Sequence, residues 1–119
     1  MNEIIVKENI KIENMIYEIR GKQVMLDSDL AKLYQVETKR INEAVKNNIE
    51  KFPERFCFRI TENEFNILKS KFSTSKGRGG SRKGHSVFTE QGVAMLATIL
   101  KSKVATQVSI AIMDAFIVM

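Results

Sequence analysis

The sequence has one cysteine, one histidine and one proline among its 119 residues, and each scarcity argues against a class of protein. A single cysteine cannot form an internal disulfide framework, and one cysteine with one histidine cannot make a structural zinc site unless carboxylates or another chain help. One proline and 6 glycines, with 28% charged residues, argue against a collagen-like or a wholly disordered chain. We therefore expect no metal and no cofactor, and a fold stabilised by packing.

The sequence also lacks long apolar runs. None approaches the length of a bilayer span, which excludes a transmembrane chain. The N-terminus, MNEIIVK, has neither the basic start nor the apolar stretch of a secretory signal, so we expect a cytoplasmic protein with no membrane partner. With 44% apolar residues, the length suits a single domain over residues 16–119, preceded by an arm over residues 1–15.

Positive charge is concentrated in one segment. Residues 73–86 contain no acidic residue and four basic ones, which account for +4 of the net charge of +5. The four are Lys76, Arg78, Arg82 and Lys83. The other residues of this segment are Gly, Ser, Thr and His, which cannot form a core, so we predict a mobile loop. A local cluster of cations in an otherwise nearly neutral chain indicates a polyanionic partner.

Short β-prone runs and helical periodicity alternate in the first half of the chain. Residues 16–20 and 23–26 flank Gly21-Lys22, which suits a type II′ hairpin turn. Asp27-Ser28-Asp29 supplies N-cap candidates for a short helix. A second helix, over residues 38–48, is predicted three residues after the first one ends.

The second half predicts one more strand and three more helices. Residues 56–60 alternate as a strand, and Thr61 with Glu64 matches a capping box for the next helix. Thr89 and Ser102 are N-cap candidates for two C-terminal helices. The expected fold is therefore α+β, with a small β-hairpin and short strands packed on a helix-turn-helix-like helical pair and two C-terminal helices.

The last predicted helix is apolar almost all round. Between residues 110 and 119 only Asp114 is polar. A surface helix of a small domain does not tolerate this composition without a partner or further chain. We therefore expect the sequence to be truncated from a longer protein with a missing C-terminal domain, and a possible homodimer contact through this helix.

The best-defined local motif is a helix-turn-helix frame. Two helices joined by three residues approach closely, which requires a small residue at the contact, here Ala31, and apolar residues at Val36, Ile41 and Ala44. Gln35 stands where many such turns place glycine to reach a left-handed conformation. The alternative is an ordinary helical hairpin buried in the core.

The second helix of this frame carries side chains suited to DNA. Asparagine can pair with an adenine edge, lysine can contact guanine or phosphate, and a helix N-terminus can donate to phosphate. The spacing places Lys39, Asn42, Glu43 and Lys46 on one exposed face. The candidate DNA-binding residues of this helix are Thr38, Lys39, Arg40, Asn42, Glu43 and Lys46. The alternative for such a charge pattern is a solvated helix face.

The basic loop adds Lys76, Arg78, Arg82, Lys83 and His85 to the candidate site. It differs from a nucleotide-binding loop, which ends in Gly-Lys-Ser/Thr, because Gly84 and His85 follow Lys83 here. A flexible wing along the nucleic-acid backbone fits better, since cations neutralise phosphate and glycine permits close approach. The alternative is a soluble linker. Cys57 is expected to pack rather than react, and no residue pattern indicates catalysis.

Three segments resemble the phage ORF-six N-terminal domain, which is grouped with the KilA-N and Bro-N types of DNA-binding domain. They are VMLDSDLAKLYQVETKRINEAVKNN at residues 24–48, FPERFCFRIT at 52–61 and FTEQGVAML at 88–96. The resemblance implies an N-terminal DNA-binding module of phage or prophage proteins. Such modules are often followed by a different C-terminal domain and are linked to antirepressor or regulatory roles.

Together these observations predict a module that binds double-stranded DNA and is not an enzyme. The helix over residues 38–48 is expected in the groove, and the loop over residues 73–86 on the phosphate backbone. The alternative is a protein-interaction or oligomerisation module of an antirepressor that does not contact DNA. Salt separates the two, because binding through several cations weakens steeply with salt whereas an apolar interface hardly responds.

Overall fold

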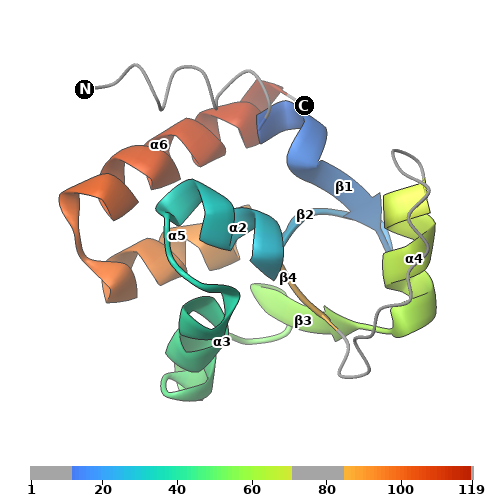
Figure 1. Cartoon of the computed structure of the whole chain (residues 1–119), viewed down its shortest axis with the longest axis horizontal. Helices are drawn as coiled ribbons and strands as arrows, with labels where there is room; N and C mark the ends of the chain where they lie inside the picture. The colour runs from blue at the N-terminus through green and yellow to red at the C-terminus, as the bar shows by residue number, and fades with distance from the viewer. Residues whose placement is uncertain (1–11, 71–84, 119) are drawn as a thin grey trace.

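The computed structural model describes residues 12–70 and 85–118. Over these residues the chain forms a four-stranded antiparallel sheet and five α-helices, which confirms the expected α+β class (Figure 1). The strands are β1 (Ile16–Ile19), β2 (Lys22–Leu26), β3 (Cys57–Ile60) and β4 (His85–Phe88), in the spatial order β1-β2-β4-β3. The helices are α2 (Asp27–Tyr34), α3 (Thr38–Lys46), α4 (Glu62–Ser70), α5 (Glu90–Leu100) and α6 (Lys103–Val118), with short 3-10 turns η1 (Glu13–Met15) and η2 (Ile49–Lys51).

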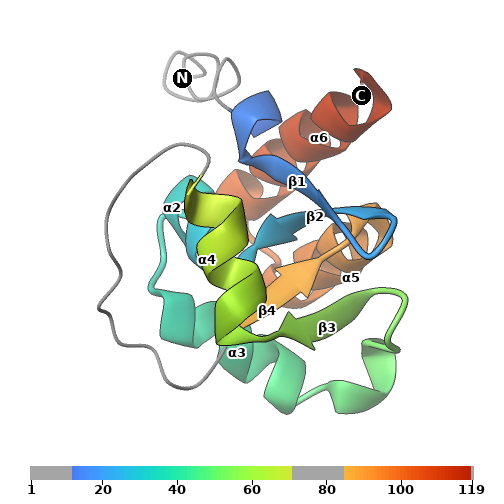
Figure 2. The ribbon, with the colours of Figure 1, turned by 90° about the vertical axis from the view of Figure 1, so that its right-hand side faces the viewer.

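Both faces of the sheet are covered by helices. Successive residues of a strand point to opposite faces. In β2, Met25 packs into a core formed with α2, α3, α5 and α6, whereas Val24 and Leu26 pack into a second core with Leu68 of α4. Figure 2 shows α4 in front of the sheet and α5 behind it. The sheet is therefore the middle of three layers.

The turn of the β1–β2 hairpin lies one residue earlier than expected. Ile19 pairs with Lys22, so the two turn residues are Arg20 and Gly21. Both have positive φ, 54° and 79°, which belongs to a type I′ turn. The prediction of a type II′ turn around Gly21-Lys22 was wrong, because strand pairing decides the position of the turn and glycine fits either one.

The side chain of Arg20 reaches from the hairpin turn to α4 and β3. Its Nε and Nη2 donate to Glu64 of α4 at 3.0 and 2.9 Å, and its guanidinium lies 5.0 Å from the centre of the Phe58 ring. Glu64 also completes the predicted capping box, because its Oε1 accepts from Thr61 N at 2.8 Å while Thr61 Oγ1 accepts from Glu64 N at 3.0 Å. The hydrogen bond from Arg20, followed by that from Thr61, lowers the pKa of Glu64 to about 2.

This depressed pKa predicts a loss of stability in acid. A carboxyl whose pKa is lower in the folded state than its ordinary value of 4.5 stabilises the fold above that value, and the contribution is lost as pH falls through about 2. We expect Glu64→Gln, which can still cap α4, to melt below the parent near neutral pH and to approach it between pH ~5 and ~2. Thermal melting over this range measures the difference, with Glu43→Gln as the exposed control. A gap that is constant with pH would contradict the prediction.

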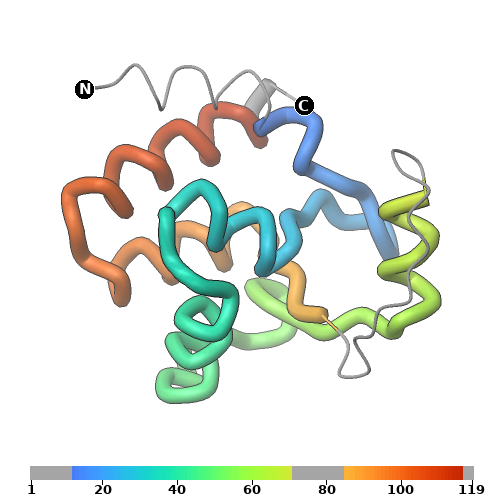
Figure 3. Tube along the Cα trace, viewed as in Figure 1, coloured from blue at the N-terminus to red at the C-terminus, as the bar shows by residue number. Residues whose placement is uncertain are grey.

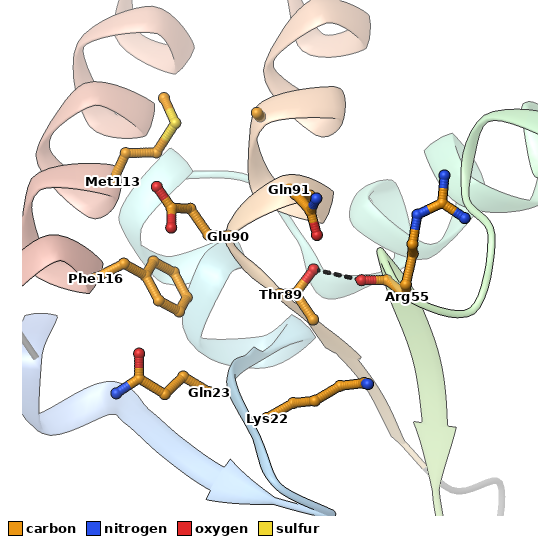
Figure 4. A pocket seen from close by; sticks show the side chains of 9 residues that line it. Lys22, Gln23, Arg55, Thr89, Glu90, Gln91, Met113 and Phe116 are labelled. Carbon is orange, nitrogen blue, oxygen red and sulfur yellow. Dashed lines mark hydrogen bonds between the residues drawn. The ribbon is translucent and has the colours of Figure 1, made fainter.

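The start of α5 is docked on the segment before β3. Thr89 is the N-cap, as predicted, and its Oγ1 accepts from Gly92 N at 3.3 Å. The same hydroxyl donates to Arg55 O at 2.8 Å (Figure 4), and Thr89 N donates to Phe56 O at 3.0 Å. Gly92 lies so close to this segment that a Cβ there would overlap the carbonyl oxygen of Phe56.

The apolar helix α6 finds its packing partners within the chain. Ser102 caps it as predicted, accepting from Ala105 N at 2.9 Å. Ile112 and Phe116 are buried against α2 and α5, and Tyr34 of α2 shares a 2.6 Å hydrogen bond with Ser109. Much of the apolar side of α6 is thus covered by α2 and α5, while the expected homodimer contact and further C-terminal domain stay predictions. The exposed apolar side chains of α6 include Ile110, which is 54% exposed.

Several predicted boundaries shift by one or two residues. The strand predicted over residues 56–60 begins at Cys57, and Phe56 packs with the core opposite to that of Phe58. The helix predicted over residues 38–48 ends at Lys46, which leaves Ile49 in η2 and 64% exposed. No helix in residues 12–70 and 85–118 is long and apolar enough to cross a membrane.

Candidate nucleic-acid interface

The helix pair α2–α3 has the geometry that its sequence predicts. Three residues separate Tyr34 from Thr38, and Gln35 takes the left-handed conformation, with φ 64°. Figure 3 follows the chain through α2, the turn and α3. The contact between the helices is made by buried residues, as expected, with the exception of Val36, which is 36% exposed and does not act as an apolar anchor. The buried residues of the pair include Leu30, Ala31, Ile41 and Ala44.

The left-handed Gln35 predicts a stabilising substitution. A non-glycine residue in this conformation costs about 1–2 kcal/mol, partly offset by the larger unfolded-state entropy of glycine. We expect Gln35→Gly to stabilise the fold by about 0.5–1 kcal/mol and raise the melting temperature by a few degrees. The matched control is Lys32→Gly, at an exposed helical position of α2, which should lower stability by about the same amount. Urea or thermal unfolding measures both, and a destabilised Gln35→Gly would refute the argument.

The outer side of α3 carries cations that are open to solvent. Lys39, Arg40 and Lys46 are exposed, as is one acid, Glu43, and Thr38 is half-buried. The N-cap residue, Glu37, makes no side-chain hydrogen bond to the helix. The first N–H groups of α3 therefore lack a side-chain cap and are suited to an anionic oxygen.

Asn42 does not share this exposed face, contrary to expectation. It is half-buried, and its Nδ2 donates to Asp27 Oδ2 at 2.8 Å and to Thr38 O at 3.3 Å. Its side chain therefore faces α2. The periodicity predicted the correct helix, but Asn42 lies at the border between the exposed and buried sides, where the carboxylate of Asp27 draws it inward.

The four cations of the basic loop, Lys76, Arg78, Arg82 and Lys83, lie outside the described residues. His85 is described, and it is the first residue of β4, paired with Ile60, rather than a loop residue. Its ring stacks on Phe65 of α4, with the ring centres 3.7 Å apart and an interplanar angle of 11°. This ring contact joins the start of β4 to α4.

Cys57 is half-buried and packs against the core, as predicted. Burial, and then the nearby Asp27, raise the pKa of the thiol to about 12, so it stays protonated. Within the part of the chain that the structure describes, no group of three His, Cys, Asp or Glu side chains could hold a metal ion.

Most of the described chain matches a known protein family. A family model described as the ORF6N domain matches residues 14–99. The chain belongs to the ORF6N domain family. The match spans the hairpin, the α2–α3 pair, β3, α4, β4 and most of α5, which confirms the resemblance seen in the sequence, and the family is associated with phages. No curated protein and no solved structure matches the chain.

The ORF6N domain also has an open pocket of about 580 Å³, separate from α3 (Figure 4). Its lining comes from β2, the segment before β3, α5 and α6, and none of it from α2 or α3. Lys22 and Arg55 bring positive charge, whereas Glu90 brings negative charge. The pocket therefore lacks the excess of positive charge on the outer side of α3, where three exposed cations accompany one exposed acid.

One residue of the candidate interface was missed from the sequence. Asp27 was expected to be an N-cap candidate, but Leu26 is the N-cap residue and Asp27 lies inside the first turn of α2. Its carboxylate is 4% exposed and bonds to residues 15 and 59 positions away. No local signal in the sequence could have revealed these partners.

Proposed function

We propose that this ORF6N domain is a DNA-binding module of a phage or prophage-derived regulatory protein of the antirepressor type. It binds double-stranded DNA and is not an enzyme. In this proposal the outer side of α3 enters the groove, and the basic segment before β4, with Lys76, Arg78, Arg82 and Lys83, follows the phosphate backbone.

The observation that carries the proposal is the exposed, cationic outer side of α3 in a helix-turn-helix arrangement. In such motifs the second helix enters the major groove, and its N-terminal residues contact base edges. Lys39 and Arg40 occupy that position in α3, next to a helix N-terminus without a side-chain cap. Cations can contact guanine edges or phosphates, and N–H groups at the start of a helix can donate to phosphate.

A second line of support is the distribution of charge along the chain. The loop joins α4 to β4 and carries +4 of the net +5 charge. Concentrated cations with glycines between them suit contacts to a phosphate backbone, which fix the register of a protein on DNA without reading sequence. In the proposal the loop therefore binds the phosphate backbone, while α3 contacts the bases in the groove.

Binding to random duplex DNA across a salt series tests the proposal. We expect the logarithm of the binding constant to fall linearly with the logarithm of salt concentration, with a slope of about −0.9 for each neutralised phosphate. Lys39→Ala should weaken binding and, if Lys39 contacts phosphate, reduce the slope by about 1. Lys103→Ala, an exposed lysine on α6, is the matched control and should leave both unchanged.

The result that would overturn the proposal is the absence of duplex binding at low salt. Association of the protein with itself or with a protein partner, insensitive to salt, would favour the alternative of an interaction module. Equal effects of Lys39→Ala and Lys103→Ala would show that net charge, and not α3, determines binding.

A further inference from the structure

A buried carboxylate joins three elements beneath α3. Asp27, the first residue of α2, is 4% exposed. Its Oδ2 accepts hydrogen bonds from Asn42 Nδ2 of α3 at 2.8 Å and from the backbone N–H of Ser86 in β4 at 3.3 Å. The Ser86 hydroxyl accepts from Arg59 Nη1 of β3 at 3.2 Å. A single oxygen atom therefore links α3 to the middle of the sheet.

The amide of Asn42 has no free donor. An asparagine amide carries two N–H donors, and a carboxylate can only accept, so the amide nitrogen must face Asp27. Its two bonds, to Asp27 Oδ2 and to Thr38 O, use both donors. Pairing with adenine needs the amide to donate to N7 and accept from N6. Asn42 could do this only by leaving a buried carboxylate short of a donor, which is costly.

Apolar packing and the bond to Asp27 together hold α3, which lies against α2 and α5. The helix has nine residues, of which only Ile41 and Ala44 are buried. Hydrogen bonds to a charged acceptor are stronger and more directional than neutral ones. Apolar packing is not directional, so we expect the bond to Asp27 to contribute much of what sets the angle of this short helix to the sheet.

We infer that Asp27 is a positioning residue for DNA recognition, and that Asn42 acts through it by fixing α3 on the sheet rather than by touching a base. This inference rests on the proposed function of α3. Asn42 then has a structural role and is not a base-contacting residue. The inference also predicts that Asp27, which is buried and cannot reach DNA, affects the preference of the protein for its DNA sequence.

Exchanging the two side chains tests the inference in the full chain. A preferred duplex is selected for the parent, and affinities for it and for a scrambled duplex give a preference ratio. Asn42→Asp places two carboxylates together and should lower the ratio about tenfold. Asp27→Asn keeps an acceptor oxygen and should hold the ratio within about twofold. The double variant Asp27→Asn/Asn42→Asp re-forms the bond between positions 27 and 42 with donor and acceptor exchanged, but it gives up the bond to Thr38 O and competes with the bond from Ser86 N. It should therefore raise the ratio at least about threefold above that of Asn42→Asp without restoring it fully.

Base reading by Asn42 predicts a different outcome. The double variant would still lack the amide at position 42, so the ratio would stay as low as in Asn42→Asp, and this result would overturn the inference. Thermal melting shows which variants are folded. If Asn42→Asp alone does not fold, the folded double variant still decides the question through its ratio.

Hydrogen exchange separates this inference from the proposed function. Without DNA, Asn42→Asp should speed exchange of the α3 amides and leave those of α5 unchanged, and the double variant should reverse this. A parent that binds no duplex DNA, together with this exchange pattern, would refute the proposed function but keep Asp27 as the anchor of α3. A parent that binds DNA while Asn42→Asp leaves α3 exchange unchanged would refute the positioning role alone.

Discussion

Replacing the four cations of the basic loop with serine is expected to weaken binding to every duplex by about 100- to 1,000-fold near 0.1 M salt. The four are Lys76, Arg78, Arg82 and Lys83. The salt slope should also flatten by about 0.9 for each phosphate that is no longer neutralised, and so by as much as about 3.6 if all four cations bind phosphate. The preference between sequences should change little, because phosphates are common to all duplexes.

A variant with the same change of charge controls for net charge. Its four exposed lysines lie outside the loop and α3: Lys22, Lys32, Lys101 and Lys103. Serine at these positions should weaken binding far less. Comparable reductions in affinity for the two variants would show that the loop has no special place in the interface, and unchanged affinity of the loop variant would exclude it altogether.

Gly92→Ala is expected to destabilise the fold more than any other single substitution proposed above. The added Cβ would overlap the carbonyl oxygen of Phe56, which is backbone and already accepts from Thr89 N. Relief requires α5 to move away from the segment that precedes β3, so we expect the free energy of unfolding to fall by about 3 kcal/mol and the melting temperature by roughly 10–15 °C.

Two control substitutions isolate this clash. Thr98→Ala, at an exposed position of the same helix, should change stability by less than about 0.5 kcal/mol. Gly21→Ala meets no atom within 4 Å but has φ +79°, so it should show the backbone strain alone, about 1–2 kcal/mol. If Gly92→Ala lowers the free energy of unfolding no more than Gly21→Ala does, α5 can move away from Phe56 at little cost. That result would contradict the predicted clash.

The features that sequence predicted best are those set by neighbouring residues. The capping box of Thr61 and Glu64, the N-cap at Thr89 and the three-residue turn after Tyr34 depend on interactions within a few positions. Local chemistry determines them wherever the segment lies in the fold. At Gln35 the sequence indicated only that such turns often place glycine there, and the structure shows the left-handed conformation at this position.

The features that sequence reasoning missed are set by distant residues. Glycine allows either hairpin turn, and only the pairing of Ile19 with Lys22 selects one. Periodicity cannot tell that Asn42 turns inward, because the cause is a carboxylate 15 residues earlier. The composition of α6 gave no indication that α2 and α5 would cover the buried side chains of this helix. For the candidate site, sequence therefore identified the helix but not the part played by each side chain.

The strand order β1-β2-β4-β3 bears on how the domain forms during synthesis. Both β2 and β3 pair with β4, and β3 pairs with no other strand of the sheet. Between the completion of β3 and the arrival of β4 the ribosome adds about 25 residues, which takes about 1–5 s at typical elongation rates. During that time the N-terminal hairpin and β3 cannot join, since the strand that belongs between them has not been made. We therefore expect the sheet to close in one late step rather than to grow from its N-terminal hairpin, with the edge of β3 open to wrong pairing until β4 emerges.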